Sequence, residues 1–274
     1  MKISTLIENA SHPVLEDLQA EHGLSFYIEH DGIIFMSDVG LSGKFAENAS
    51  ILGVDISAVE ALVVTHHHFD HGGGLGRYLD KNTDGKVYLR YTPNVDYVVE
   101  GDSSLPHYVG LDKEILAAFS DRITYIDKNQ QVLPGVHLLV DILDNYPKPS
   151  GDTRLKMQIG STVQPDHFAH ELVTVILDEG GLVVLTGCAH NGVLNMVDTA
   201  RMAFPDQPVK AVIGGFHLSQ EDDIAVENIA EALLNQDIPR IYSGHCTGEK
   251  QMEILKQILG ERLMYLHTGL FIEL

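Results

Sequence analysis

Four side chains of the kinds that bind metal ions follow an apolar stretch (residues 61–65) and precede three consecutive glycines: His66, His68, Asp70 and His71. The apolar stretch is typical of a buried strand. Side chains alternate along a strand, so His66 and His68 point one way and His67 points the other. Two imidazoles on one side supply half of a tetrahedral zinc site. Asp70 and His71 lie where the glycines let the backbone turn, so they can face a second ion close by. The stretch therefore predicts a dinuclear metal site for zinc, with iron or manganese as alternatives.

Three apolar stretches in the second half of the chain end in glycine with histidine close behind: Gly187-Cys188-Ala189-His190, Gly214-Gly215-Phe216-His217 and Gly244-His245-Cys246. In layered α/β folds, ligands collect at strand ends because the loops converge there. The metals need donors beyond the first loop, so His190 and His245 are predicted to be ligands. His217 is predicted to be a ligand or a substrate contact.

Three further residues have more than one interpretation. Cys188 is either a small buried side chain or a thiolate bound to, or bridging near, the metals. Asp38 ends another expected strand before a glycine, where it either caps a turn or holds a metal-site loop from behind the ligands. His170, just before a later strand, is a weaker candidate for the metal or its surroundings. His167 is a weaker candidate of the same kind. The remaining histidines, His22 among them, receive no role at the site, except that His107 in the segment 80–160 could contact substrate.

The elements that must position these residues are short strands and helices that alternate in two similar halves. We expect helices at 44–52, 75–79, 112–119, 193–202, 221–234 and 249–259. We expect strands at 1–7, 24–30, 33–37, 61–65, 87–91, 123–126, 136–140, 172–177, 182–185, 209–213, 238–242, 263–266 and 270–272. Residues 1–274 are predicted to form one domain. Its least regular part, 80–160, is predicted to be an insert that walls the pocket, with peripheral packing as the alternative.

The composition narrows the class of protein. The formal net charge of −21 argues against binding of nucleic acid or of an anionic membrane surface, although it could equally serve solubility alone. No apolar run is long enough for a membrane span, and the first residues lack the apolar core of a signal peptide. Only two cysteines occur, which indicates a reducing compartment. We therefore expect a cytoplasmic protein with a small-molecule substrate, and its oligomeric state is not predicted.

The pattern His-x-His-x-Asp-His resembles the signature of the metallo-β-lactamase superfamily. Asp38 is similar to its first motif, and His245 in Tyr242-Ser243-Gly244-His245 is similar to its last. The resemblance implies an α/β fold, a four-layer αββα sandwich with the site at one edge, and it favours a site role for Asp38. The middle motif departs, because the superfamily usually has a bridging aspartate after Thr-Gly, where this chain has Cys188. The third ligand of the first metal and the nature of any bridge are therefore left open.

The departure itself resembles one subgroup. Its motifs Gly-Cys-Ala-His-x-Gly, Gly-Gly-Phe-His-Leu and His-Cys-Thr-Gly are all present, as are the segments beginning at Glu21 and Tyr108. Some members are described as dihydropterin–ribofuranosylaminobenzene-phosphate synthase-like, and most as metal-dependent hydrolases. The resemblance covers nearly the whole chain.

The leading functional prediction is metal-assisted hydrolysis of a small ester, thioester, lactone or phosphodiester. One zinc ion would lower the pKa of a bound water, and its expected ligands are His66, His68 and His190. A second ion would share the hydroxide and polarise the substrate, and its expected ligands are Asp70, His71 and His245. Asp70, which could also steer the proton, and His217 are the predicted catalytic residues.

Three alternatives use the same ligands. A condensation of a pterin pyrophosphate would use the ions to stabilise the leaving pyrophosphate rather than to deliver water. A metal-dependent sensor would bind an anionic, pterin-like or nucleotide ligand without turnover. A redox or oxygen-handling di-iron site would need an electron partner, for which the chain has no flavin or iron–sulfur signature.

Overall fold

Two seven-stranded sheets form the body of the protein, which is described here from a computed structural model covering residues 1–100 and 106–274. The first sheet has the order β18 (Phe271–Glu273), β1 (Lys2–Ile7), β2 (Ser25–His30), β3 (Ile33–Ser37), β4 (Ala61–Val63), β5 (Lys86–Arg90), β8 (Ile123–Ile126). The second has the order β17 (Leu263–Tyr265), β16 (Arg240–Gly244), β15 (Val209–Gly215), β14 (Gly181–Leu185), β13 (Val173–Asp178), β10 (Val136–Leu139), β9 (Gln130–Leu133).

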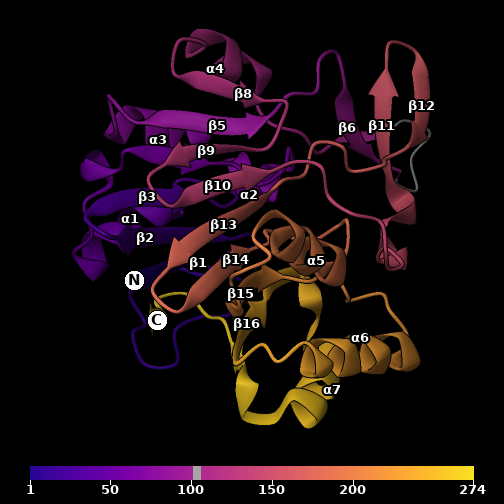
Figure 1. Cartoon of the computed structure of the whole chain (residues 1–274). Helices are drawn as coiled ribbons and strands as arrows, with labels where there is room; N and C mark the ends of the chain where they lie inside the picture. Colours follow the sequence, from indigo (N-terminus) through magenta and orange to yellow (C-terminus); the bar gives the residue numbers. More distant parts are fainter. Residues whose placement is uncertain (101–105) are drawn as a thin grey trace.

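The two sheets pack face to face and carry helices on their outer faces (Figure 1). Apolar side chains of both sheets, such as Phe26, Phe35 and Ile213, form the fully buried core between them. The first sheet is covered by α1 (Lys44–Leu52), α3 (Leu75–Lys81) and α4 (Lys113–Ala118). The second is covered by α5 (Val193–Ala203), α6 (Asp223–Asn235) and α7 (Glu249–Leu259). This arrangement confirms the predicted four-layer αββα sandwich.

Parallel pairing brings the site loops to one edge of the sandwich. Strands β3, β4 and β5 are parallel in the first sheet, and β14, β15 and β16 are parallel in the second. The carboxyl ends of parallel neighbours lie on the same side, and the loops that follow them therefore meet there. One of these loops contains the short helix α2 (Phe69–Gly72).

The segment 80–160 is not a separate unit. It supplies β5 and β8 to the first sheet and β9 and β10 to the second. Its remaining strands join a small antiparallel sheet at the side of the sandwich, whose order is β12 (Thr162–Pro165), β11 (Leu155–Ile159), β6 (Asp96–Val99), β7 (His107–Tyr108). A 3₁₀ helix, η2 (Ser150–Arg154), precedes β11. The role of the segment as a wall of the pocket stays a prediction. Residues 101–105 of the segment lie outside the described residues.

Several strands are shorter than expected or were not expected. Strand β4, which precedes His66, ends at Val63 rather than at residue 65, because the chain turns toward the site before the first histidine. Strands β6, β7, β9, β11 and β12 are short. Four of them build the side sheet and β9 lies at the edge of the second sheet, where burial imposes little apolar alternation. Among the residues that the structure describes, no helix has both the length and the apolarity to cross a bilayer.

Candidate metal centre

The loops that carry the candidate ligands have unusual backbones. Asp38, Ala189, His217 and His245 have φ of 60°, 59°, 49° and 50°, a left-handed conformation that non-glycine residues rarely adopt. Gly187, with φ of 63°, shows why glycine precedes one of these loops, because a Cβ there would lie 2.3 Å from Oγ1 of Thr65. The strand end of one sheet thus touches the strand end of the other directly behind the site.

Three imidazoles form the first group of candidate ligands: His66, His68 and His190. The ring centroids of His66 and His68 are 4.7 Å apart, and those of His66 and His190 are 5.0 Å apart. The Nε2 atoms of all three rings are buried and have no hydrogen-bond partner among the described residues. Buried polar atoms are normally paired, so three unpaired lone-pair donors that face one another fit a metal ion. His67 points away and bonds the carbonyl of Arg90 at 2.8 Å, as predicted, although the strand itself ends before these histidines.

The second group has mixed donors: Asp70, His71, Cys188 and His245. Nε2 of His71 lies 3.2 Å from Nε2 of His245 and 3.1 Å from Sγ of Cys188. Oδ2 of Asp70 lies 3.4 Å from Nε2 of His245 and 3.9 Å from Nε2 of His71. Two ligand atoms on one tetrahedral zinc ion are separated by about 3.3–3.6 Å, given ordinary zinc–nitrogen and zinc–sulfur bond lengths. The spacing in this group is therefore that of one coordination sphere.

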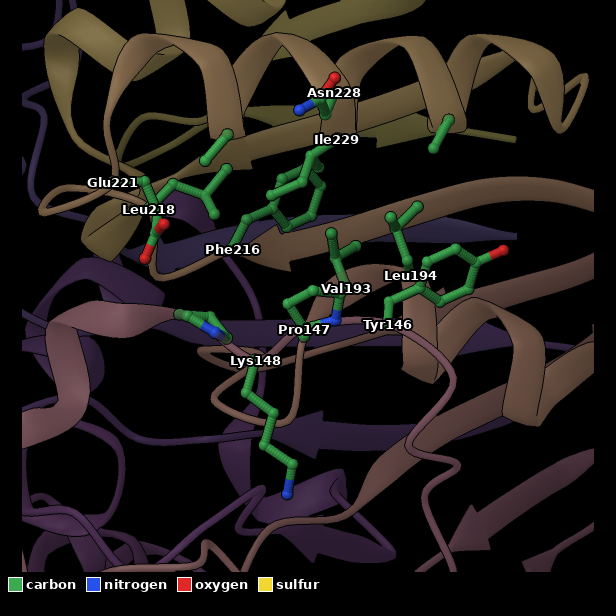
Figure 2. Close-up of a pocket in the computed structure, with 14 residues that line it drawn as sticks. Tyr146, Pro147, Lys148, Val193, Leu194, Phe216, Leu218, Glu221, Asn228 and Ile229 are labelled. Carbon is green, nitrogen blue, oxygen red and sulfur yellow. The ribbon is translucent and has the colours of Figure 1, made fainter.

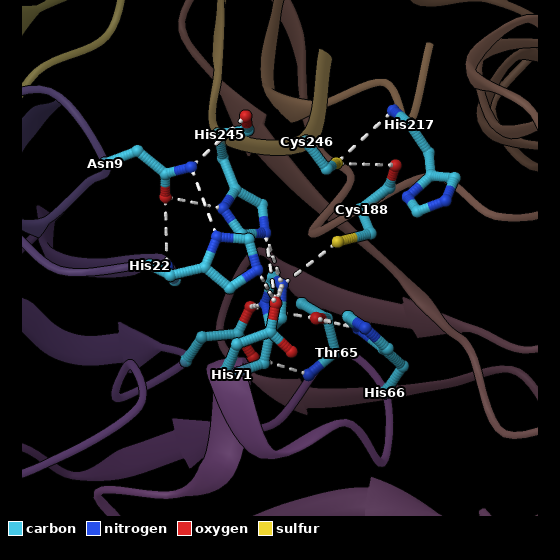
Figure 3. A network of polar contacts seen from close by, with 12 residues as sticks. Asn9, His22, Thr65, His66, His71, Cys188, His217, His245 and Cys246 are labelled. Carbon is cyan, nitrogen blue, oxygen red and sulfur yellow. Dashed lines mark hydrogen bonds and ion pairs between the residues drawn. The ribbon is translucent and has the colours of Figure 1, made fainter. Parts of the chain in front are cut away.

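Neighbouring acceptors fix both imidazole rings of the second group. Nδ1 of His71 bonds Oδ2 of Asp38 at 2.7 Å, and Nδ1 of His245 bonds Oδ1 of Asn9 at 2.9 Å, as Figure 3 shows for the latter pair. Each bond leaves Nε2 of the ring facing the other candidate ligands. A metal-bound histidine commonly donates its second ring proton in this way. Asp38 thus stands behind the ligands, and its carboxylate also accepts bonds from the backbone N–H and the hydroxyl of Thr65, both at 2.8 Å.

Cys188 belongs to both halves of the site. Its thiol lies in the second group and also in a group with His190 and His217. Both cysteines are free, and the thiol of Cys246 lies 3.6 Å from the carbonyl oxygen of Cys188 (Figure 3). Cys188 therefore lies between the two groups, where a thiolate could contact either ion or both.

Burial and neighbouring charges set the protonation of the candidate ligands. Burial, and then the neighbouring imidazoles, hold the pKa values of His66 and His68 well below the usual value, so both rings are neutral. Burial opposes the charge on Asp70, but His71 and the hydrogen bonds from His22 and His245 outweigh it and keep the pKa of Asp70 well below its usual value. In the second group, burial lowers the pKa of His71, but the carboxylates of Asp38 and Asp70 outweigh it and raise this pKa to about 9, so the ring must lose a proton when it binds a metal ion.

Two predicted residues border the groups. His170 forms a further group of possible ligands with His68 and Asp166, but both of its ring nitrogens are engaged, Nδ1 with the N–H of His67 at 3.0 Å and Nε2 with Asp166 at 3.1 Å. His217 is half-buried, its ring centroid lies 4.3 Å from that of His190, and its Nε2 is 2.8 Å from Oδ1 of Asp152.

Four residues at the site had no predicted role. His22 lies against the second group, with its Nε2 3.2 Å from Oδ2 of Asp70, so its assignment away from the site was wrong. Asn9, Asp152 and Glu171 support the ligand loops, Glu171 through the backbone N–H groups of residues 190 and 191. The conspicuous segment Glu21-His22-Gly23 was the only available signal for His22, and nothing in the sequence distinguishes the other three from ordinary loop residues.

A cavity of about 550 Å³ opens onto both groups. Candidate ligands and His217 form its floor, and Phe69, Val99, Val109 and Leu155 form an apolar side. No lysine or arginine is found among the described lining residues. The site therefore combines a floor of candidate metal ligands with an apolar wall partly supplied by the small side sheet.

Known proteins resemble this chain over most of its length. A protein of Methanocaldococcus jannaschii named 7,8-dihydropterin-6-methyl-4-(beta-D-ribofuranosyl)-aminobenzene-5'-phosphate synthase is 28% identical over 267 residues, which cover 93% of this chain and 90% of that protein. The crystal structure of a metal-dependent hydrolase of the beta-lactamase superfamily is 27% identical and matches with a TM-score of 0.83, covering 100% of this chain and 99% of that one. Zn²⁺-bound PqqB from Methylobacterium extorquens is 13% identical over 100% of both chains, with a TM-score of 0.56, which is a likeness of fold alone.

The sequence model of the metallo-beta-lactamase superfamily matches residues 18–245, well over half of the chain. This match agrees with the four-layer sandwich and with ligand-type side chains gathered at the predicted edge. The chain belongs to the metallo-β-lactamase superfamily.

Proposed function

We propose that the protein is a metal-dependent hydrolase that binds two zinc ions and cleaves a small ester, thioester, lactone or phosphodiester. The observation that carries this proposal is the convergence of three buried, unpaired Nε2 atoms beside a second group with coordination-sphere spacing. We assign one ion to His66, His68 and His190, and the other to the group that contains His71. The free thiols of both cysteines favour a reducing compartment such as the cytoplasm.

The chain's own residues would bind and orient the reactants. Zinc, when bound, would lower the pKa of a water toward neutrality and polarise the oxygen of the scissile group. Asp70 has one carboxylate oxygen close to His22 and His245, from where it can hold a proton removed from the nucleophile. His217 lines the cavity beside His190 and can hydrogen-bond the substrate. The apolar side at Val99, Val109 and Leu155 would exclude water and hold an uncharged part of the substrate.

A condensation reaction is the second candidate. It is favoured by one observation, the synthase named above that resembles 93% of this chain. In such a reaction the same residues would hold a dihydropterin pyrophosphate, and the amino nitrogen of an aminobenzene riboside phosphate would attack the methylene carbon that carries the pyrophosphate. The new C–N bond would replace the C–O bond, pyrophosphate would leave, and the nitrogen would lose a proton. The described cavity lining has no lysine or arginine, so the phosphates would have to be bound by the ions and by histidines such as His22 and His217.

Elemental analysis tests the metal site that both functions share, and two activity assays separate the functions. Elemental analysis of protein purified without added metal should find about two zinc ions per chain, as the two ligand groups require. The same protein is then assayed for hydrolysis of model thioesters, lactones and phosphodiesters, and separately for pyrophosphate release from a dihydropterin pyrophosphate with the aminobenzene riboside phosphate. Hydrolysis that disappears in His68→Ala supports the first proposal. Pyrophosphate release that depends on the second substrate, without hydrolysis, would replace it by the second.

A further inference from the structure

One carboxylate oxygen serves two imidazoles at the site. Oδ1 of Asp152 lies 2.9 Å from Nδ1 of His190 and 2.8 Å from Nε2 of His217. Oδ2 of the same carboxylate is buried and has no hydrogen-bond partner among the described residues. A buried carboxylate normally accepts hydrogen bonds through both oxygens. Here only Oδ1 does so, and both of its bonds go to imidazoles of the site.

The contact decides which nitrogen of His190 faces the first group. Because Nδ1 donates its proton to Asp152, the lone pair resides on Nε2, and Nε2 is the atom left unpaired beside His66 and His68. The ring also stacks on Phe168, at a centroid distance of 4.4 Å and an interplanar angle of 5°. Phe168 limits tilting of the ring, and Asp152 sets its rotation and tautomer.

The chain that leads to Asp152 is fastened to the second sheet's helix layer. Oδ1 of Asn195 accepts bonds from the backbone N–H groups of Asn145 and Tyr146, both at 2.8 Å. Nζ of Lys148 donates to Oδ1 of Asn191 at 2.8 Å, and the hydroxyl of Ser150 donates to Glu221 at 2.7 Å. These bonds tie the connection to the start of α5 and to the segment just before α6.

The same connection also lines an apolar cavity and packs closely at Gly151. Pro147 lies over a cavity of about 340 Å³ together with Val193 and Phe216, which directly precedes His217 (Figure 2). Gly151, next to Asp152, lies so close to Gln220 that a Cβ there would be 2.9 Å from the Cβ of Gln220. The aspartate is therefore delivered by a fixed segment and not by a freely moving loop.

We propose that Asp152 is the positioning residue of the first metal group, which sets the rotation and tautomer of His190 and, through the same oxygen, holds His217 beside it. The proposal rests on the proposed metal function. It concerns a residue from the connection between the side sheet and the sandwich, outside every strand-end motif. Loss of a carboxylate behind a metal-bound histidine typically weakens the metal by about 10–100-fold. The second group shares no hydrogen bond with Asp152, so its ion should be retained.

The test measures zinc affinity and not turnover. The full chain is stripped with a chelator and titrated with zinc against a chromophoric competitor, for the native protein and for Asp152→Ala, Asp152→Asn and His66→Ala. Asp144→Asn makes the same chemical change at an exposed position of the same connection and is the matched control. Cobalt(II) spectra of each variant report the ligand field of the remaining ions, and thermal unfolding reports folding.

We expect one of two zinc ions to bind about 10–100-fold more weakly in Asp152→Ala and Asp152→Asn, with the other ion and the control unchanged. If Asp152→Ala does not fold, the isosteric Asp152→Asn decides. Unchanged affinity for both ions in the folded variant overturns the proposal, as does an equal weakening of both ions together with the melting temperature, which would indicate a merely structural role. If His66→Ala also leaves both ions in place, the proposed metal function itself is wrong, and the two failures are thereby distinguished.

Discussion

Asp38→Asn is the substitution that most directly tests how the second ligand group is held. Asp38 is 1% exposed and accepts hydrogen bonds from the backbone and hydroxyl of Thr65 and from His71. Asparagine has nearly the same shape and tolerates the φ of 60° at this position, so the change removes charge and acceptor capacity without adding backbone strain.

The size of the effect depends on which hydrogen bonds the asparagine side chain can keep. Its oxygen can keep the bond from the N–H of Thr65, and the threonine hydroxyl can rotate, so the loss falls on the bond from His71. A hydrogen bond to a charged group is worth about 1.5–3 kcal/mol. The free energy of unfolding of the metal-free protein should therefore fall by no more than this amount. His71 can avoid this loss by moving its proton to Nε2 and accepting from the new NH₂ group through Nδ1. That tautomer has no lone pair facing Cys188 and His245, so we expect about 10–100-fold weaker binding of the second ion.

Two assays check this expectation. Urea unfolding of chelator-treated protein measures the free energy of unfolding, and competition titration measures the affinity of each ion. Asp31→Asn is the matched control, because Asp31 also has a positive φ, of 47°, but is exposed in a hairpin turn remote from the ligands. Native affinity for both ions in Asp38→Asn would refute the assignment of His71 as an oriented ligand.

Three further changes test other parts of the site. Cys188→Ala should lower the zinc content per chain measured by elemental analysis, and unchanged content would make its thiol a packing group only. Gly187→Ala should lower the free energy of unfolding in urea by more than about 2 kcal/mol, because the left-handed backbone and a clash with Thr65 both oppose the new side chain. Gly53→Ala is the control: φ is 73° and the space around it is open, so only the backbone cost of about 1–2 kcal/mol should remain. Leu155→Ala should raise KM and leave kcat unchanged if the side sheet walls the pocket, and an unaltered KM would contradict that prediction.

The parts of the site that were predictable from sequence are those with a local pattern. The apolar run before His66 and the glycines after His71 indicated a strand followed by a turn, and three later glycine-histidine loops had the same form. Parallel pairing then brought these strand ends together at one edge. Residues within one loop share a short piece of backbone, so their mutual geometry depends on few long-range contacts.

The residues that hold the ligands from behind were not predictable in this way. Asn9 meets His245 across 236 residues of sequence, and Asp152 meets His190 across 38, so no local periodicity connects either pair. Asp152 follows a proline- and glycine-containing stretch that has the composition of an ordinary loop. Its role depends on where Asn195 and Glu221 fasten that stretch, and this is a property of the folded sandwich alone.

The position of Cys188 links the fold to the choice of metal. The superfamily motif predicts a carboxylate after Thr-Gly. This chain has Cys188 there instead, and its sulfur lies 3.1 Å from Nε2 of His71. A thiolate is a softer donor than a carboxylate and favours zinc over manganese or magnesium. Its position depends on the contact of Gly187 with Thr65, which joins the strand end of one sheet to that of the other. The placement of one sheet against the other therefore sets the distance from this sulfur to the histidines of the first loop. A displacement of either sheet would alter both ligand groups.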